Sequence, residues 1–122
     1  MHENKYKEIV DNANSIILLM NTRGNIVFLN KFGERFFGYR ERDILGESVI
    51  GTIVPSANSS GQDLERMIKA IITDPSQYSV NENENMRSNG ERVRILWTNK
   101  AIIGYDGCVE EILCIGNQIK GN

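Results

Sequence analysis

The chain has 122 residues, 40% of them hydrophobic and 25% charged, with a formal net charge of −2. This length fits one globular domain, residues 1–122, whose core needs no disulfide or metal, and the charge gives no electrostatic basis for binding nucleic acid or an anionic membrane surface. No apolar run approaches the roughly 20 residues that span a bilayer, and no signal peptide opens the chain. We therefore expect this fragment to be cytoplasmic and to make no direct contact with a membrane. A parent protein that is anchored in a membrane elsewhere along its chain is compatible with this expectation.

The first 13 residues contain an amphipathic pattern. Tyr6, Ile9, Val10 and Ala13 fall at i, i+3, i+4 and i+7, which predicts a helix across Asn4–Ala13 with one apolar stripe. A helix this short is marginal alone and needs a surface to lie on. We expect it to cap the sheet of its own domain or to pair with its copy in a dimer, and the two arrangements are compatible.

A hairpin followed by a helix is predicted next. Two short apolar runs, Ser15–Asn21 and Ile26–Asn30, are separated by a turn that contains Gly24. Asn30 occupies the position from which its side-chain oxygen can cap a helix over Lys31–Phe37, because it can accept a backbone N–H two or three residues later.

Two further helical segments precede the main sheet. Gly38 is expected to end the first helix in a left-handed conformation, and Glu41–Leu45 predicts another short turn of helix. The sequence from Ser60 to Asp63 resembles a capping box. It introduces a helix that ends at Asp74-Pro75, with an apolar stripe formed by Leu64, Met67, Ile68, Ile71 and Ile72.

Met86–Ile119 predicts strand, turn, long strand, turn and strand. From Val93 to Ile103 the odd positions are apolar except Asn99, and such alternation indicates a strand with one buried face, on which Trp97 lies. Asn89-Gly90 and Asp106-Gly107 are typical hairpin turns. Before them, residues 81–85 are polar throughout, which favours an exposed stretch.

The last strand is predicted to lie in the centre of the sheet. Val109–Ile119 is apolar at both odd and even positions, a pattern typical of a strand that is covered on both faces. Three antiparallel strands in a meander therefore form the scaffold that the rest of the chain covers.

The residues needed for common catalytic sites are missing. The only histidine is His2, so no catalytic site that depends on a histidine can be assembled. The two glycine-rich motifs that bind phosphate groups, G-x-x-x-x-G-K-[ST] and G-x-G-x-x-G, do not occur. Cys108 and Cys114 lack metal-ligand spacing, and we interpret them as a turn residue and a small buried hydrophobe. We therefore expect a regulatory or binding domain that is not an enzyme.

The order of these motifs resembles the PAS family. Its first half runs, roughly, D-x-x-G-x-I, then N, then G-Y, then E-L-x-G, matched here at Asn21–Ile26, Asn30, Gly38-Tyr39 and Asp43–Gly46. Its second half has a turn glycine, a tryptophan-bearing strand, a D-G turn and a closing G-x-D-I-T, matched at Gly90, Trp97, Asp106-Gly107 and Gly116–Lys120. The resemblance covers the chain from about Ile9 to Ile119.

The resemblance implies an α+β fold, PAS-like or profilin-like, with a five-stranded antiparallel sheet and helices on one face. Residues 1–13 would form an N-terminal helical cap and residues 15–119 the PAS core. It further implies a sensory PAS/PAC module of a bacterial-type signalling protein, above all the input domain of a sensor histidine kinase in a two-component system. Such a module binds a small ligand or forms a weak homodimer, and acts on a downstream domain of the same chain. The alternative is a ligand-free interaction domain of a transcription regulator or a cyclic-dinucleotide signalling protein.

The cofactors known in this family are not expected here. Haem-binding members usually supply an axial histidine from the helix that corresponds to Asp63–Ile72, which has none. Flavin photosensors carry an N-C-R-F-L-Q motif near Asp43–Pro55, and it is missing, as is the haem attachment sequence C-x-x-C-H. We predict a colourless domain that holds neither haem nor flavin, with a small ligand of another kind still open.

Four residues are candidates for lining a ligand pocket: Tyr39, Met67, Trp97 and Asn99. Asn99 is the one polar residue in its row, and a buried amide needs partners. It either orients a small ligand between sheet and helices or bonds to helix backbone or an ordered water, and the Tyr39 hydroxyl has the same two interpretations. Met67 offers a sulfur that can ligate iron, although a Met on an apolar helical stripe is more often a core residue.

Signal output is expected through the last strand. Gln118 stands where the family has a closing Asp that ties the strand end to the following segment by charge-assisted hydrogen bonds. A neutral amide makes weaker bonds, so we expect either looser coupling at this junction or a junction that is tied by other contacts.

Overall fold

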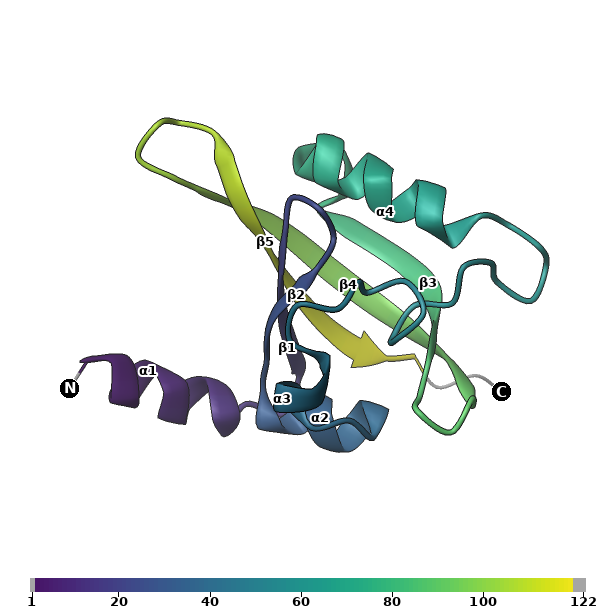
Figure 1. Ribbon diagram of the computed structural model, residues 1–122, viewed down its shortest axis with the longest axis horizontal. Helices are drawn as coiled ribbons and strands as arrows, with labels where there is room; N and C mark the ends of the chain where they lie inside the picture. Colours follow the sequence, from purple (N-terminus) through teal and green to yellow (C-terminus); the bar gives the residue numbers. More distant parts are fainter. Residues whose placement is uncertain (1, 120–122) are drawn as a thin grey trace.

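The computed structural model describes the backbone of residues 2–119, and side chains at residue 5 and from residue 7 onward. Figure 1 shows an antiparallel sheet with short helices packed against it. The elements are α1 (His2–Asp11), β1 (Ile16–Asn21), β2 (Ile26–Leu29), α2 (Lys31–Phe37), α3 (Glu41–Ile44), α4 (Leu64–Thr73), the 3₁₀ helix η1 (Pro75–Tyr78), β3 (Val80–Met86), β4 (Arg92–Ile103) and β5 (Val109–Gln118).

The sheet has five strands in the order β2-β1-β5-β4-β3, and neighbouring strands are antiparallel. The expected meander is therefore confirmed, and β5 is the central strand, with Ile16 of β1 opposite Gly116 on one side and Trp97 of β4 opposite the same residue on the other. The two predicted hairpin turns have Gly90 and Gly107 at φ 89° and 81°, a conformation that glycine adopts without steric cost.

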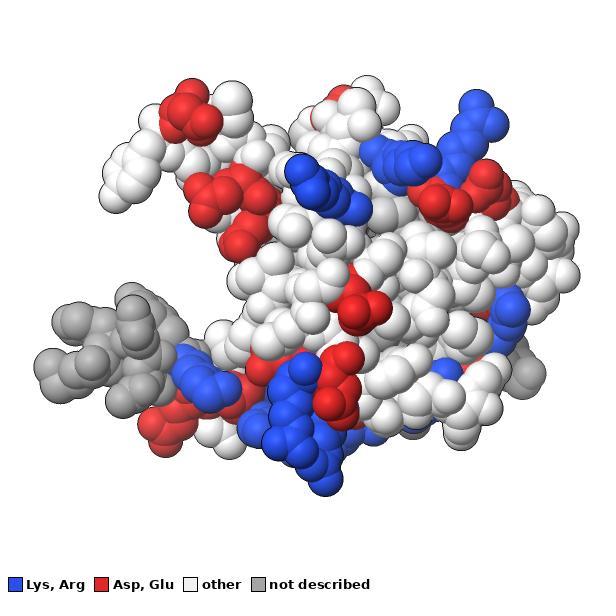
Figure 2. Space-filling model, viewed as in Figure 1, with Lys and Arg blue, Asp and Glu red and all other residues white. Residues whose placement is uncertain are grey.

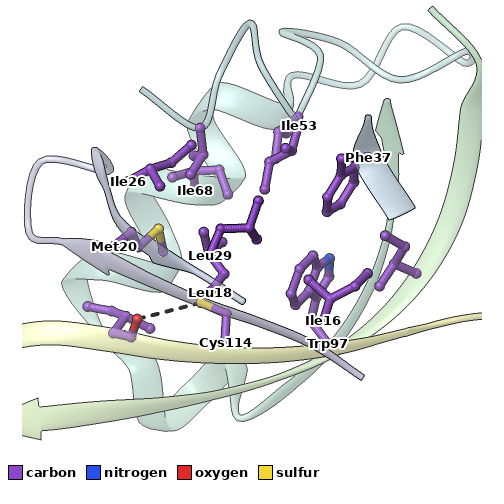
Figure 3. Packing of buried hydrophobic residues seen from close by; sticks show 14 of the residues in the cluster. Ile16, Leu18, Met20, Ile26, Leu29, Phe37, Ile53, Ile68, Trp97 and Cys114 are labelled. Atoms are coloured by element: carbon purple, nitrogen blue, oxygen red, sulfur yellow. Dashed lines mark hydrogen bonds between the residues drawn. The ribbon is translucent and has the colours of Figure 1, made fainter. Parts of the chain in front are cut away.

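One face of the sheet forms the core. Figure 3 shows Phe37, Ile53 and Ile68 from the covering segments pointing toward Leu18, Trp97 and Cys114 on the strands. The opposite face carries the alternate side chains, and there Leu113 and Ile115 of β5 are only half-buried while Leu96 of β4 is 43% exposed. The prediction that β5 is covered on both faces was therefore right for the helix side alone.

The N-terminal helix is present but does not lie over the sheet. In Figure 1, α1 extends away from the strands and its C-terminal end lies near α2. Of the predicted apolar stripe, Ile9 is 58% exposed and Val10 is half-buried, whereas the Tyr6 side chain is outside the described residues. The stripe thus keeps uncovered apolar surface. Of the two expected arrangements, packing on the sheet of its own domain is not the one seen, and pairing with a second copy stays a prediction.

Asn30 joins the N-terminal segments to the sheet. The predicted N-cap of α2 is confirmed, because Asn30 Oδ1 accepts from Gly33 N at 3.0 Å. The same oxygen accepts from Ile17 N at 3.0 Å, and Asn30 Nδ2 donates to the carbonyls of Val10 at 3.0 Å and Ser15 at 2.9 Å. This fully buried amide therefore connects α1, the segment after it, β1 and α2.

Two further helix ends can be compared with the sequence, the C-terminal end of α2 and the N-terminal end of α4. Gly38 ends α2 with φ 82° and donates its N–H to Glu34 O, as predicted. The N-cap of α4 is Asp63, whose side chain accepts from Arg66 N at 3.0 Å. The capping box that begins at Ser60 was therefore wrong, because Asp63 is itself the capping residue.

Candidate ligand-binding site

A small cavity lies between the inner face of the sheet and the segments that cover it. About 20 Å³ is open to the centre of a water-sized sphere, which is room for roughly one water molecule. Among the described residues, none that line this cavity is charged. The lining is apolar apart from four asparagines, and comprises Leu18, Met20, Val49, Ile53, Val54, Ile68, Ile71, Asn81, Asn83, Asn85, Trp97, Asn99 and Cys114.

Three of the asparagines come from β3, an edge strand. Its sequence alternates Asn and Glu from Asn81 to Asn85, so successive side chains point to opposite faces of the sheet. The asparagines face inward, where Asn83 is 7% exposed and Asn85 is fully buried, while the glutamates face outward. The prediction of an exposed stretch was wrong for the asparagines. The repeat of Asn at every second position indicates that the asparagines share one face of the strand, but both faces are polar, so it does not show which of them points inward.

One end of the asparagine row is fully bonded. Asn85 Nδ2 donates to Ile53 O at 3.1 Å, and Asn85 Oδ1 accepts from Trp97 Nε1 at 3.0 Å. Both partners are buried, and Trp97 is only 5% exposed, which confirms its predicted place in the core. These bonds fix the indole and join β3 to both β4 and the segment that contains Ile53.

The other end of the row connects β4 to β3 and to η1. Asn99 Nδ2 donates to Tyr78 O at 2.8 Å and to Asn81 Oδ1 at 2.6 Å. Asn99 therefore has a backbone partner, as expected if its amide has a structural role. It also lies at the cavity wall, which the ligand interpretation requires.

The middle of the row is not satisfied. Asn81 Nδ2 and Asn83 Oδ1 are both buried and have no hydrogen-bond partner among the described residues. Asn83 Nδ2 has only the sulfur of Met67, at 3.7 Å, as acceptor, and a thioether sulfur is a weak acceptor. Since most buried polar atoms in proteins are paired, these two atoms mark the cavity as a place where a further polar group fits.

The sequence-predicted candidates fall in different places. Trp97 and Asn99 both line the cavity. Met67, on α4, contacts the cavity wall through Asn83 and otherwise faces an open surface hollow beside Tyr78. Tyr39 is half-buried at the edge of the core after α2 and is not part of the cavity lining.

The predicted output residue lies at the end of the central strand. Gln118 is exposed and sits opposite Ile95 of β4. Its neighbour Asn117 accepts a hydrogen bond from Ser15 Oγ at 2.9 Å, and Ser15 lies in the segment between α1 and β1. The end of β5 and the segment that leads into β1 are therefore in contact at this point. The periodicity of the sequence does not predict this contact.

The outer side of β3 holds the loop that leads into α4. The carboxylate of Glu84 accepts from Ser59 Oγ at 3.0 Å and from Arg92 Nη1 at 2.7 Å, and Arg92 also donates to Ala57 O at 2.9 Å. Burial acts to raise the pKa of Glu84, but the hydrogen bonds from Arg92 and Ser59 outweigh it, so the pKa lies below its usual value. The ionised carboxylate thus stabilises the loop beside the cavity.

The residues present do not fit haem or flavin. The cavity lining has no imidazole, and the only thiol there, Cys114, has its pKa raised to about 12 by burial and stays protonated at neutral pH. In the described part of the chain, no group of three or more His, Cys, Asp and Glu side chains is placed to hold a metal ion. The water-sized space also lacks the volume for a macrocycle or a three-ring system.

Charges on the surface are mixed in sign. On the face seen in Figure 2, Lys and Arg side chains lie beside Asp and Glu side chains over α2 and α3. One such pair is Lys31 Nζ with Glu34 Oε1 at 3.6 Å. Within residues 2–119, no helix has the length and hydrophobicity to cross a membrane.

Comparison with known proteins agrees with this architecture. A PAS domain from Colwellia psychrerythraea superposes with a TM-score of 0.79 at 19% identity, covering 98% of both chains. The PAS domain of the RpfR quorum-sensing receptor from Cronobacter turicensis, in complex with C12:0, has a TM-score of 0.66 at 24% identity, covering 91% of this chain and 99% of that one. A LOV protein from Rhodobacter sphaeroides has a TM-score of 0.71 at 17% identity, covering 97% and 67%.

Sequence comparison gives the family. A search among curated proteins found no significant match. The family model of the PAS fold, however, matches residues 4–119, which is nearly the whole chain. Together with the five-stranded sheet and its covering helices, this match shows that the chain belongs to the PAS family.

Proposed function

We propose that this PAS domain is the sensory input module of a larger signalling protein, and that it detects a small molecule in the cavity beside Trp97. The observation that carries the proposal is the pair of unpartnered buried atoms, Asn81 Nδ2 and Asn83 Oδ1, in an uncharged cavity whose lining is apolar apart from its four asparagines. Ligand pockets typically combine apolar walls with a few placed polar groups. A PAS domain of the same fold in complex with C12:0 supports ligand binding by this architecture.

The direct test is native mass spectrometry of the purified 122-residue domain, combined with an absorption spectrum. We expect a small organic molecule to be retained or to bind from a metabolite extract, and no absorption band at 400–450 nm (roughly where haem and flavin absorb), because the lining has no imidazole and the water-sized space is too small for either cofactor. A stoichiometric coloured cofactor would contradict the absence of haem and flavin. A domain that binds no small molecule would favour the ligand-free interaction module instead.

The parent protein that we favour is a cytoplasmic sensor histidine kinase, with output through the end of β5. Cys114 lines the cavity from β5, and Gln118 lies four residues further along the same strand, so a change at the wall is transmitted to the strand end. In the parent protein, Gln118→Asp should alter basal output. Because Gln118 is exposed, the same change should leave the stability of the isolated domain within about 0.5 kcal/mol. Unchanged output, or a large loss of stability, would contradict this route.

A second role, weak homodimerisation, is supported by uncovered apolar surface. Ile9 on α1 is 58% exposed, and Leu96 and Ile102 are exposed on the open face of the sheet. Identical patches on two copies can meet about a two-fold axis, the commonest arrangement of soluble homo-oligomers. Deleting residues 1–13 should change the oligomeric state or lower the melting temperature. Sedimentation and melting curves that the deletion leaves unchanged would refute the role of α1.

A further inference from the structure

The asparagine row presents a donor of fixed direction. Asn99 Nδ2 donates to Tyr78 O at 2.8 Å, and a backbone carbonyl can only accept, so the Asn99 amide group has one favourable orientation. The same nitrogen donates to Asn81 Oδ1, which means that Asn81 must present its oxygen to Asn99. The Asn81 amide nitrogen is therefore directed elsewhere, and it is buried without a partner among the described residues.

Asn83 supplies the complementary acceptor. Its Oδ1 is unpartnered in the described structure, and its side chain is held only by the contact of Nδ2 with Met67 Sδ at 3.7 Å. Met67 is flexible and its sulfur is a weak acceptor, so this contact gives way easily to a better one. Asn81 and Asn83 point to the same face of β3 because they are two residues apart. A donor and an acceptor thus lie next to each other on one wall of the cavity.

Keeping Asn83 at this position lowers the stability of the fold. An unsatisfied buried polar group destabilises the folded state, whereas an apolar residue of similar shape does not. Leu is of similar size and would suit the apolar neighbours Ile53, Ile68 and Ile71. Asn85, two residues later, is different, because both ends of its amide have protein partners. A residue that weakens the fold and whose side chain makes only one weak bond to it, here to Met67 Sδ, is typical of a functional position.

The charge of the cavity restricts what can bind there. None of the lining residues is charged, so an ion that entered would lose its hydration without gaining a counter-charge. Acids that are ionised at neutral pH and amines that are protonated are therefore disfavoured. The space measures about 20 Å³, and a ligand larger than a water molecule must displace flexible side chains such as Met67, which favours small ligands.

Building on the proposed function, we propose that the cavity selects small uncharged amides, including lactams. The carbonyl oxygen of the ligand accepts a hydrogen bond from Asn81 Nδ2, and its N–H donates to Asn83 Oδ1, which satisfies both unpartnered atoms at once. The hydrocarbon part of the ligand contacts Ile53 and Ile68, which line the apolar side of the same cavity.

The test compares two probes of the same shape that differ in charge, isobutyramide and isobutyrate. Each is titrated at neutral pH into the ¹⁵N-labelled 122-residue domain, and the side-chain NH₂ signals of Asn81 and Asn83 are followed by NMR. We expect isobutyramide to shift both signals with a Kd of roughly 1–10 mM, as suits so small a ligand. Isobutyrate should bind at least about tenfold more weakly. Equal or stronger binding of isobutyrate, or no shift of these signals with isobutyramide, would overturn the proposal.

Two variants on the same strand separate ligand binding from folding. Asn83→Leu should abolish the isobutyramide shifts and raise the melting temperature by about 2–8 °C, because it removes an unsatisfied buried group. The matched control, Asn85→Leu, should lower the melting temperature, because it leaves Trp97 Nε1–H buried without a partner and removes one of the two hydrogen bonds to Ile53 O, which keeps the N–H of Met86 at 2.8 Å. If Asn83→Leu lowers the melting temperature, Asn83 is structural and the proposal is wrong. A second variant, Asn83→Ala, removes the same acceptor and should also abolish the isobutyramide shifts; shifts that persist in Asn83→Ala would overturn the proposal.

The outcomes also separate this inference from the proposed function. If an anionic molecule is retained in native mass spectrometry, the domain is a small-molecule sensor and the amide class is wrong. If only an ordered water joins Asn81 to Asn83 and no probe displaces it, the amide class is likewise wrong. If no small molecule of any class binds, the proposed function itself fails.

Discussion

Replacing Asn30 by Ala tests the central role that the structure gives to this residue. The side chain makes four hydrogen bonds, two accepted from the backbone N–H groups of Ile17 and Gly33 and two donated to the carbonyls of Val10 and Ser15. Loss of a helix N-cap costs about 1 kcal/mol. Ile17 N and Ser15 O are only partly buried, so the loss of each bond should cost about 1 kcal/mol, near the lower end for an unsatisfied group, whereas Val10 O keeps the N–H of Ala13 at 3.3 Å and should cost about 0.5 kcal/mol. The expected loss is therefore about 3–4 kcal/mol, a large part of the stability of a typical domain.

The assay is urea denaturation, with Asp63→Ala as the matched control. Asp63 is also an N-cap, but it is exposed and makes one such bond, to Arg66 N, so its loss should cost only about 1 kcal/mol. Both variants should keep the slope of unfolding free energy against urea, because the surface exposed on unfolding is unchanged. An Asn30→Ala loss no larger than that of Asp63→Ala would refute the reasoning.

A second substitution separates the accepted bonds from the donated ones. Asn30→Asp keeps the two accepted bonds but places carboxylate oxygen against the carbonyls of Val10 and Ser15. The folded state then favours the protonated carboxyl and raises its pKa above the usual value of about 3.9. A group with a raised folded pKa stabilises the fold below its unfolded pKa and loses that contribution as the pH rises. The Asn30→Asp variant should therefore gain stability relative to wild type on acidification, and no gain would contradict the donor role of Nδ2.

Three further predictions follow from the core and the loop beside the cavity. Trp97→Ala should cost about 3–5 kcal/mol in denaturant melts, while Trp97→Phe, which strands Asn85 Oδ1, should cost about 1–3 kcal/mol; a loss below about 1 kcal/mol for Trp97→Ala would contradict the burial of its ring. Because the pKa of Glu84 is lowered from 4.5, the bonds to the loop persist above that pKa and are lost as the pH falls through it. The amide signal of Ser59, which donates to this carboxylate, should titrate with a midpoint below 4.5 and should cease to titrate in Glu84→Gln. A thiol reagent at neutral pH should label Cys108, which is exposed, and spare Cys114, whose pKa burial raises to about 12, and equal labelling of both in the folded protein would refute this.

Local patterns in the sequence were enough to predict the strands and turns of the scaffold. The alternation around Trp97 predicted a long strand with that ring in the core, and the structure has it there. The turn glycines Gly90 and Gly107 separated the three strands correctly, and Asn30 and Gly38 marked the ends of α2. These features are determined by the conformational preferences of a few consecutive residues, so no knowledge of distant contacts is needed to predict them.

Part of the candidate site could also be predicted from the sequence. Asn99 and Trp97 share a strand face because their positions are two residues apart, and both line the cavity. Tyr39 and Met67 do not line it, since their places depend on how the helices pack and not on the period of a strand. The direction of α1, which leaves Ile9 exposed, was likewise decided by packing.

The row of asparagines on β3 was decided only by the tertiary structure. In an Asn-Glu alternation both faces are polar, so hydrophobic periodicity cannot say which one points inward. The choice comes from the pairing with β4, in which Asn81 stands opposite Trp97 and Asn85 opposite Val93. A shift of one residue in that register would turn the glutamates into the core, where an unpaired carboxylate is far more costly to bury than an amide. The cavity and its two unpartnered atoms exist because the observed register avoids that cost.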